Sequence, residues 1–122
     1  TEEGLKTALK LLKDIRKEFE TNLFIPGSTE GVNIELEKAL RLNDFITMGE
    51  LIAYDALNRN ESCGGHFREE YQTEEGEAKR DDENYFYVSC WEYQGSDDVA
   101  PVLYKEPLVY EAIKVQTRNY KS

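Results

Sequence analysis

Arg59-Asn-Glu-Ser-Cys-Gly-Gly-His-Phe-Arg-Glu-Glu-Tyr71 is the stretch from which the fold can be worked out. It stands between a long segment with helical periodicity and a tail rich in aromatic and β-branched residues. It contains the only histidine, one of the two cysteines and the only Gly-Gly pair of the chain. Glycine adopts positive φ where a helix must end and the chain must turn. We therefore divide the chain into a helical segment (1–58), this Gly-Gly-His hinge (59–71) and a tail (72–122).

The helical segment contains two amphipathic patterns, over about residues 2–20 and 33–58. Three- and four-residue steps between apolar residues predict a buried face on the first helix, made by Leu5, Ala8, Leu9, Leu12, Ile15 and Phe19. On the second helix one face carries Leu36, Ala39, Leu40, Ile46, Ala53, Ala56 and Leu57, and the flanks carry Leu42, Phe45, Leu51 and Ile52. Thr1 could cap the first helix, Ser28, Thr29 and Asn33 are candidates near the start of the second, and Pro26-Gly27 marks the connecting turn.

The second helix is apolar over so wide an arc that the first helix alone does not cover it. Either the tail wraps over the rest or a third helix is missing, since two helices make a poor bundle. Gly49 is expected to mark a close approach to a neighbouring helix or a small kink. The predicted fold is therefore mainly α: an antiparallel, spectrin-repeat-like, incomplete three-helix bundle, followed by an extended tail that carries a β-hairpin.

The tail begins with a highly polar loop, residues 72–84. Aromatic and β-branched residues then predict strands at about 85–93 and 102–106, separated by a turn around Gly95-Ser96. Pro107 is expected to end the second strand, because proline cannot donate to the ladder. The remaining residues are expected to be extended.

The composition excludes several partners. With 25 acidic against 15 basic residues the formal charge is −10, which disfavours nucleic acid and anionic membrane surfaces. No apolar run is long enough for a spanning helix, so direct membrane insertion is not expected. Cys63 and Cys90 are expected to be free thiols in the reducing cytoplasm. Because the chain starts at Thr1, we expect it to be a piece of a longer or processed polypeptide.

The hinge holds the residues that could carry chemistry. His66 could act as an acid or base, with Glu61, Glu69 or Asp81 as partners, yet carboxylates are too abundant for their proximity to mean much. The spacing Cys63-x-x-His66 occurs in zinc sites, but only Cys90 remains to complete the nitrogen and sulfur ligands.

Three further motifs are better explained by structure than by chemistry. Ser62 lacks the flanking glycines of a nucleophile elbow, and Gly64-Gly65 lacks the lysine and other glycines of a phosphate loop. The acidic run 81–83 lacks calcium-loop spacing. The residues themselves therefore predict no catalytic, cofactor-binding or metal-binding site in this chain.

The order of motifs resembles one known family, the flavoprotein subunits of succinate dehydrogenase and fumarate reductase, to which L-aspartate oxidase is related. The stretch 56–70 is similar to the family's Ala-Leu-x-Arg-x-Glu-Ser-Arg-Gly-x-His-x-Arg-x-Asp pattern, and 80–84 to its Arg-Asp-Asp segment. Pro107-Leu108-Val109 and the terminal Tyr120 also fit. The departures are Cys63 in place of Arg, Gly65 in place of Ala, and Glu106 where Arg is common before the proline.

The resemblance implies that this chain is the family's C-terminal helical domain, inert alone. It implies a parent subunit with covalent FAD that interconverts succinate and fumarate by hydride transfer. Electrons would pass to an iron–sulfur subunit and a membrane anchor, on the cytoplasmic face of the inner membrane. The partner of this chain would be the flavin domain of the same polypeptide. The residues expected to support that interdomain docking are Glu61, Ser62, Gly64, His66 and Arg68, with His66 and Arg68 making hydrogen bonds or ion pairs to it.

An alternative belongs to a different class. A free-standing acidic adaptor domain could bind a partner helix through the apolar flank formed by Phe45, Leu51 and Ile52.

Overall fold

The structure is a computed structural model that describes residues 1–96 and 98–117. The chain divides into two compact units, Thr1–Arg59 and Asn60–Ser122, and each is described by itself. Tyr120, which the sequence comparison singles out, lies outside the described residues.

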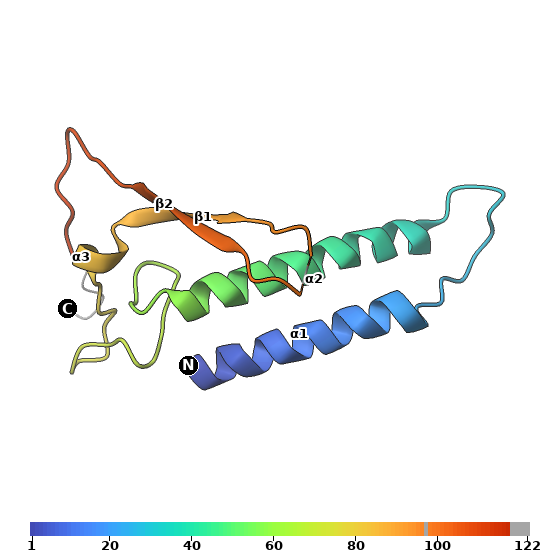
Figure 1. The fold of residues 1–122 in the computed structure, drawn as a ribbon, viewed down its shortest axis with the longest axis horizontal. Helices are drawn as coiled ribbons and strands as arrows, with labels where there is room; N and C mark the ends of the chain where they lie inside the picture. The colour runs from blue at the N-terminus through green and yellow to red at the C-terminus, as the bar shows by residue number, and fades with distance from the viewer. Residues whose placement is uncertain (97, 118–122) are drawn as a thin grey trace. The chain divides into compact units, whose positions relative to one another are not determined.

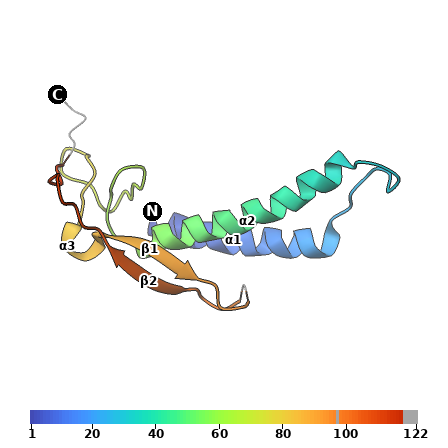
Figure 2. The ribbon, with the colours of Figure 1, turned by 90° about the horizontal axis from the view of Figure 1, so that it is seen from above.

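The first unit is a pair of antiparallel helices, α1 (Glu2–Asn22) and α2 (Ile34–Asn58), which pack side by side (Figures 1 and 2). Thr1 caps α1 as predicted, because its hydroxyl accepts a hydrogen bond from the Gly4 N–H at 3.1 Å. Most of the predicted apolar face of α1 is half-buried. The helix continues two residues beyond the predicted end at residue 20.

The prediction for Ile15 is wrong. Ile15 is 48% exposed, whereas Arg16 is buried at 8% exposure. Both positions fit a three- or four-residue step between Leu12 and Phe19, so periodicity alone does not choose between them. Arg16 occupies the inner position because its guanidinium donates to Glu50 Oε2 at 2.5 Å and to Thr47 Oγ1 at 3.2 Å on α2. Pairing a buried charge in this way offsets part of its desolvation cost.

Asn33, one of the candidate caps, fixes the start of α2. Its Oδ1 accepts hydrogen bonds from the N–H groups of Glu35 and Leu36 at 3.1 and 3.2 Å. Its Nδ2 donates to the Pro26 carbonyl at 3.3 Å, which ties the connecting loop to the cap. Gly27 in this loop has φ +120°, a conformation that residues with a Cβ rarely adopt. The loop and the helix start are therefore built as one unit.

The packed face of α2 is narrow. Ile46 and Ala53 are buried, and Gly49 between them faces α1, where an added Cβ would lie 3.5 Å from Leu12 Cδ2. The close approach predicted at Gly49 is therefore confirmed. Leu36 and Leu40, which share the predicted apolar face with Ile46 and Ala53, are 45% and 64% exposed, so α1 covers only part of that face. The flank residues Leu42, Phe45, Leu51 and Ile52 are all exposed, so α1 covers one side of α2 only, as expected.

The second unit contains a short helix and a hairpin. Helix α3 (Asp82–Tyr85) is capped by Asp81, whose Oδ1 accepts from the Asn84 N–H at 3.2 Å. The prediction of a loop to residue 84 and a strand from Tyr85 is wrong here, because a helix of four residues carries no periodicity. Strands β1 (Tyr87–Glu92) and β2 (Val102–Pro107) pair antiparallel, with Tyr87 opposite Pro107 (Figure 2). The predicted hairpin is confirmed, and Pro107 is the last residue of β2. The fold is thus mainly helical with an antiparallel hairpin after the long helices.

Candidate functional site

The hinge folds around a tight turn, residues 63–66, which we call the Gly-Gly turn. The N–H of Cys63 donates to the carbonyl of His66 at 2.8 Å, and the N–H of His66 donates to the carbonyl of Cys63 at 3.1 Å. Gly64 has φ +59° at the first central position of this turn. A left-handed residue at that position matches the right-handed twist of the paired chain on either side. Backbone geometry therefore requires glycine at position 64, whereas the φ of Gly65 is not positive.

Ser62 closes the loop that carries the Gly-Gly turn. Its side chain is fully buried, with 0% exposure. The Ser62 hydroxyl accepts from the Arg68 N–H at 2.8 Å and donates to the Arg68 carbonyl at 3.1 Å. The Ser62 N–H donates to the Lys79 carbonyl at 2.9 Å. Ser62 therefore links its own segment to the segments that contain Arg68 and Lys79. Its role is structural, since all these partners are backbone atoms.

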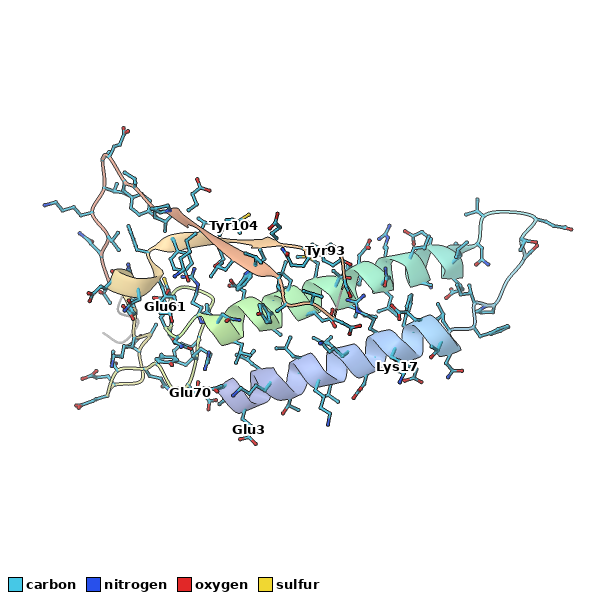
Figure 3. The ribbon with its side chains drawn as sticks, viewed as in Figure 1. Glu3, Lys17, Glu61, Glu70, Tyr93 and Tyr104 are labelled. Atoms are coloured by element: carbon cyan, nitrogen blue, oxygen red, sulfur yellow. The ribbon has the colours of Figure 1, made fainter. Side chains whose placement is uncertain are left out.

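Two buried charges support the same loop. Arg68 is 2% exposed; its Nε donates to Glu70 Oε2 at 3.1 Å and its guanidinium lies 5.3 Å from the centre of the Tyr71 ring. Glu61 is 3% exposed and accepts a hydrogen bond from the Asp81 N–H at 2.9 Å. Both carboxylates are labelled in Figure 3. Hydrogen bonds to such groups offset the cost of burying them.

The five residues predicted to support docking thus gather in one small region but differ in exposure. Glu61, Ser62 and Arg68 are buried within the chain, His66 is half-buried and Gly64 is exposed. Cys63 and Gly65 beside them are exposed too. A Cβ added at Gly64 or Gly65 would meet no atom of this chain within 4 Å. The buried residues therefore form a support, and the exposed residues form an apex.

Arg80 is a further member of this region that sequence reasoning missed. Its Nε and Nη2 donate to Asp82 Oδ1 at 2.9 and 2.5 Å, and its Nη1 donates to the Gln116 carbonyl at 3.1 Å. The hydrogen bond to Asp82 is the main cause that raises the pKa of Arg80, and the nearby Cys63 and Glu61 add to it. The Arg-Asp-Asp segment gave a signal for Arg80, but its contact to residue 116 had none.

The structure also places the other residues that the sequence singles out as candidates for chemistry. Cys63 and His66 are joined through their backbones, and both cysteines are free and exposed. Within residues 1–96 and 98–117, no group of three or more His, Cys, Asp or Glu side chains could hold a metal ion. Asp81 caps α3, and Asp82 pairs with Arg80.

No helix in the described part of the chain is long and apolar enough to cross a membrane.

The described residues thus form a pair of antiparallel helices, a loop closed by the Gly-Gly turn, and a hairpin. The model of the family described as "Fumarate reductase flavoprotein C-term" matches residues 1–120. The chain belongs to this family, the C-terminal domain of the flavoprotein subunits of fumarate reductase and succinate dehydrogenase. The resemblance inferred from the hinge is therefore confirmed, and the family is that of a subunit of a multi-subunit complex.

Proposed function

We propose that this chain is the C-terminal docking domain of a flavoprotein subunit that interconverts succinate and fumarate by hydride transfer to or from FAD. The observation that carries this proposal is the family match over residues 1–120. The domain itself supports the subunit and performs no step of the reaction. Its parent passes electrons to an iron–sulfur subunit and a membrane anchor, on the cytoplasmic face of the inner membrane.

We propose that this chain does not bind FAD itself. A shallow groove of about 320 Å³ lies at the start of α2, lined by Pro26, Gly27, Ser28, Gly31, Val32, Asn33, Ile34 and Glu35. Its only charged lining residue is a glutamate, whereas a dinucleotide's diphosphate is held by cations or by clustered backbone N–H groups. We therefore place the flavin and its chemistry in another part of the parent subunit.

The Gly-Gly turn is the element proposed to dock against the flavin domain. The loop that carries the Gly-Gly turn is held by hydrogen bonds within this chain, between Ser62 and Arg68 and between Arg68 and Glu70. Its apex at Gly64 and Gly65 is exposed and presents backbone with no side chain of its own. Such an apex permits the close approach of another backbone. His66, half-buried beside the apex, is the side chain proposed to contact the flavin domain.

The apolar flank of α2 is a second surface that the parent subunit is proposed to cover. Phe45 and Ile52 are 66% and 64% exposed, and Leu51 is 37% exposed. The adaptor alternative would use the same residues. The family match favours cover by the parent subunit over cover by an unrelated helix.

A steric test addresses the Gly-Gly turn directly. The chain is mixed with the separately expressed flavin-binding part of its subunit, and their association is measured by calorimetry. Gly65→Trp adds a bulky side chain at a position where an added Cβ meets no atom within 4 Å. We expect it to weaken association at least about tenfold, a loss of roughly 1.4 kcal/mol, because the added ring clashes only with a partner.

Gly31→Trp is the matched control. Gly31 lies in the loop before α2, and an added Cβ there also meets no atom within 4 Å. We expect its association to equal that of the unchanged chain. If Gly65→Trp also binds normally, the Gly-Gly turn is not the docking element. If the unchanged chain fails to bind, the docking proposal itself is wrong.

A further inference from the structure

The residues that follow the hairpin return to the segment that precedes it. The N–H of Leu108 donates to the Phe86 carbonyl at 3.2 Å, and the Tyr110 ring packs edge-on against the Phe86 ring at 5.7 Å between centres. Further along, the Gln116 carbonyl accepts from Arg80 Nη1 at 3.1 Å. We call residues 108–117 the strap. Its first two attachments lie near β2, and the third lies six residues beyond Tyr110.

The backbone position of Arg80 is fixed by hydrogen bonds of the two residues beside it, Lys79 and Asp81. The N–H of Lys79 donates to the Tyr71 carbonyl at 3.2 Å, and the Lys79 carbonyl accepts from Ser62. The N–H of Asp81 donates to the Glu61 carboxylate at 2.9 Å. The backbone on both sides of Arg80 is therefore tied to the loop that carries the Gly-Gly turn, and only the side chain reaches the strap.

We propose that Arg80 fastens the strap to the loop of the Gly-Gly turn, so that its loss frees the strap beyond Tyr110. The Arg80 guanidinium makes two sets of hydrogen bonds. Nε and Nη2 donate to the Asp82 carboxylate, and Nη1 donates to the Gln116 carbonyl in the strap. Its side chain is only 19% exposed, which limits competition from water. A charge-assisted hydrogen bond to a carbonyl is stronger than a neutral one, and the planar fork fixes its direction.

Cleavage of the native chain by a lysine-specific protease tests this. Lys114 lies inside the strap and is exposed, and Lys105 lies in β2 and serves as an internal reference. The ratio of cleavage after Lys114 to cleavage after Lys105 is measured by mass spectrometry. For Arg80→Gln we expect this ratio to rise about fivefold or more, because native-state cleavage follows the population of the open form.

Two variants complete the design. Asp82→Asn keeps the guanidinium but removes the charge that orients it, and we expect a smaller rise of about twofold. Arg41→Gln removes an exposed arginine of α2 that pairs with Glu37, and we expect no change in the ratio. Equal ratios in Arg80→Gln and Arg41→Gln overturn the proposal.

If Arg80→Gln unfolds the hairpin, which the fluorescence of Trp91 reports, Asp82→Asn decides. A raised ratio in that variant supports the proposal, and an unchanged ratio overturns it. The test needs no partner protein, so its outcome does not depend on the docking proposal.

Discussion

Ser62 shows how one small side chain can fix a loop. It is fully buried and bonds both the N–H and the carbonyl of Arg68. Ser62→Ala leaves these two backbone groups without that partner, and each buried unsatisfied group costs about 1–3 kcal/mol. We expect the second unit to lose about 2–4 kcal/mol of unfolding free energy. Urea unfolding followed by the fluorescence of Trp91, the only tryptophan, measures this loss.

Ser28→Ala is the control for this substitution. The Ser28 hydroxyl accepts from the Glu30 N–H at 3.0 Å in an exposed loop of the first unit. We expect a change of at most about 0.5 kcal/mol, because water replaces the lost bond. A loss that small for Ser62→Ala would show that Ser62 does not hold the loop together.

Tyr104 gives a prediction about pH. Tyr104, which is labelled in Figure 3, donates its hydroxyl to Glu92 Oε2 at 3.1 Å across the hairpin. This hydrogen bond raises the pKa of Tyr104 above its usual 10.0. A raised pKa means that folding favours the protonated phenol. The contribution to stability is therefore fully present at neutral pH and is lost as the pH rises through the folded-state pKa.

We expect Glu92→Gln to shift the ionisation of Tyr104 to lower pH, because the neighbouring negative charge is removed. The alkaline absorbance titration of tyrosinate measures it, with Tyr104→Phe subtracted to isolate this residue. An unchanged titration in Glu92→Gln would mean that the hydrogen bond is not formed in solution.

At the scale of single residues, the sequence shows which residues belong to the hinge but not which atoms surround their side chains. Ser62, His66 and Arg68 could be found from the sequence, because they lie beside the only Gly-Gly pair or, for His66, are the only histidine. It did not show that Arg68 is buried against Glu70 and Tyr71, because that depends on where the chain returns. Arg16 was missed for a related reason: its hydrogen-bond partners Thr47 and Glu50 lie on another helix.

At the scale of the element, Gly49 is a weak point in α2. A glycine inside a helix costs up to about 1 kcal/mol relative to alanine. An added Cβ would lie 3.5 Å from Leu12, an ordinary van der Waals contact. We expect Gly49→Ala to raise the unfolding free energy of the helix pair by about 0.5–1 kcal/mol. Urea unfolding followed by helical circular dichroism measures it.

Gly64→Ala is the contrasting substitution. Its φ of +59° strains any residue with a Cβ, although the added atom meets nothing within 4 Å. We expect a loss of about 1 kcal/mol in the second unit, followed through Trp91. Stabilisation at Gly64, or destabilisation at Gly49, would contradict the geometry assigned to the two glycines.

Elements were predictable where their signal is long or repeated. Both long helices and the hairpin follow from periodicity and from caps such as Thr1 and Asn33. Helix α3 was missed because one turn is defined by its cap, Asp81, and not by any pattern. Leu36 and Leu40 are exposed because the apolar arc of α2 is wider than the face that α1 covers.

At the scale of the whole molecule, the first unit has an exposed apolar surface on α2 next to the narrow face that packs against α1. Phe45 and Ile52 are 66% and 64% exposed, whereas Ile46, next to Phe45, is 4% exposed. Exposed apolar patches bind hydrophobic dyes and partners. We expect the pair Phe45→Glu and Ile52→Lys to reduce binding of the dye ANS while leaving helical circular dichroism unchanged.

Ile46→Glu is the comparison, because it places a charge at a buried position of the same helix. We expect it to abolish the cooperative unfolding of the helix pair. Unchanged dye binding in the Phe45 and Ile52 pair would show that this flank is not the accessible apolar surface. The apolar residues of the flank predict that another segment packs on it. They do not identify that segment, because many different apolar surfaces could pack there.

The position of Cys63 makes the chain accessible to chemical assembly. It lies three residues after Asn60, where the second unit begins, and no cysteine precedes it. A peptide thioester ending at Ser62 can therefore be joined to a fragment that starts with Cys63, and the product has the natural sequence. Either unit can carry isotopes that the other lacks. A synthetic second fragment can also place D-alanine at Gly64, which keeps the left-handed turn while adding a methyl group to its apex.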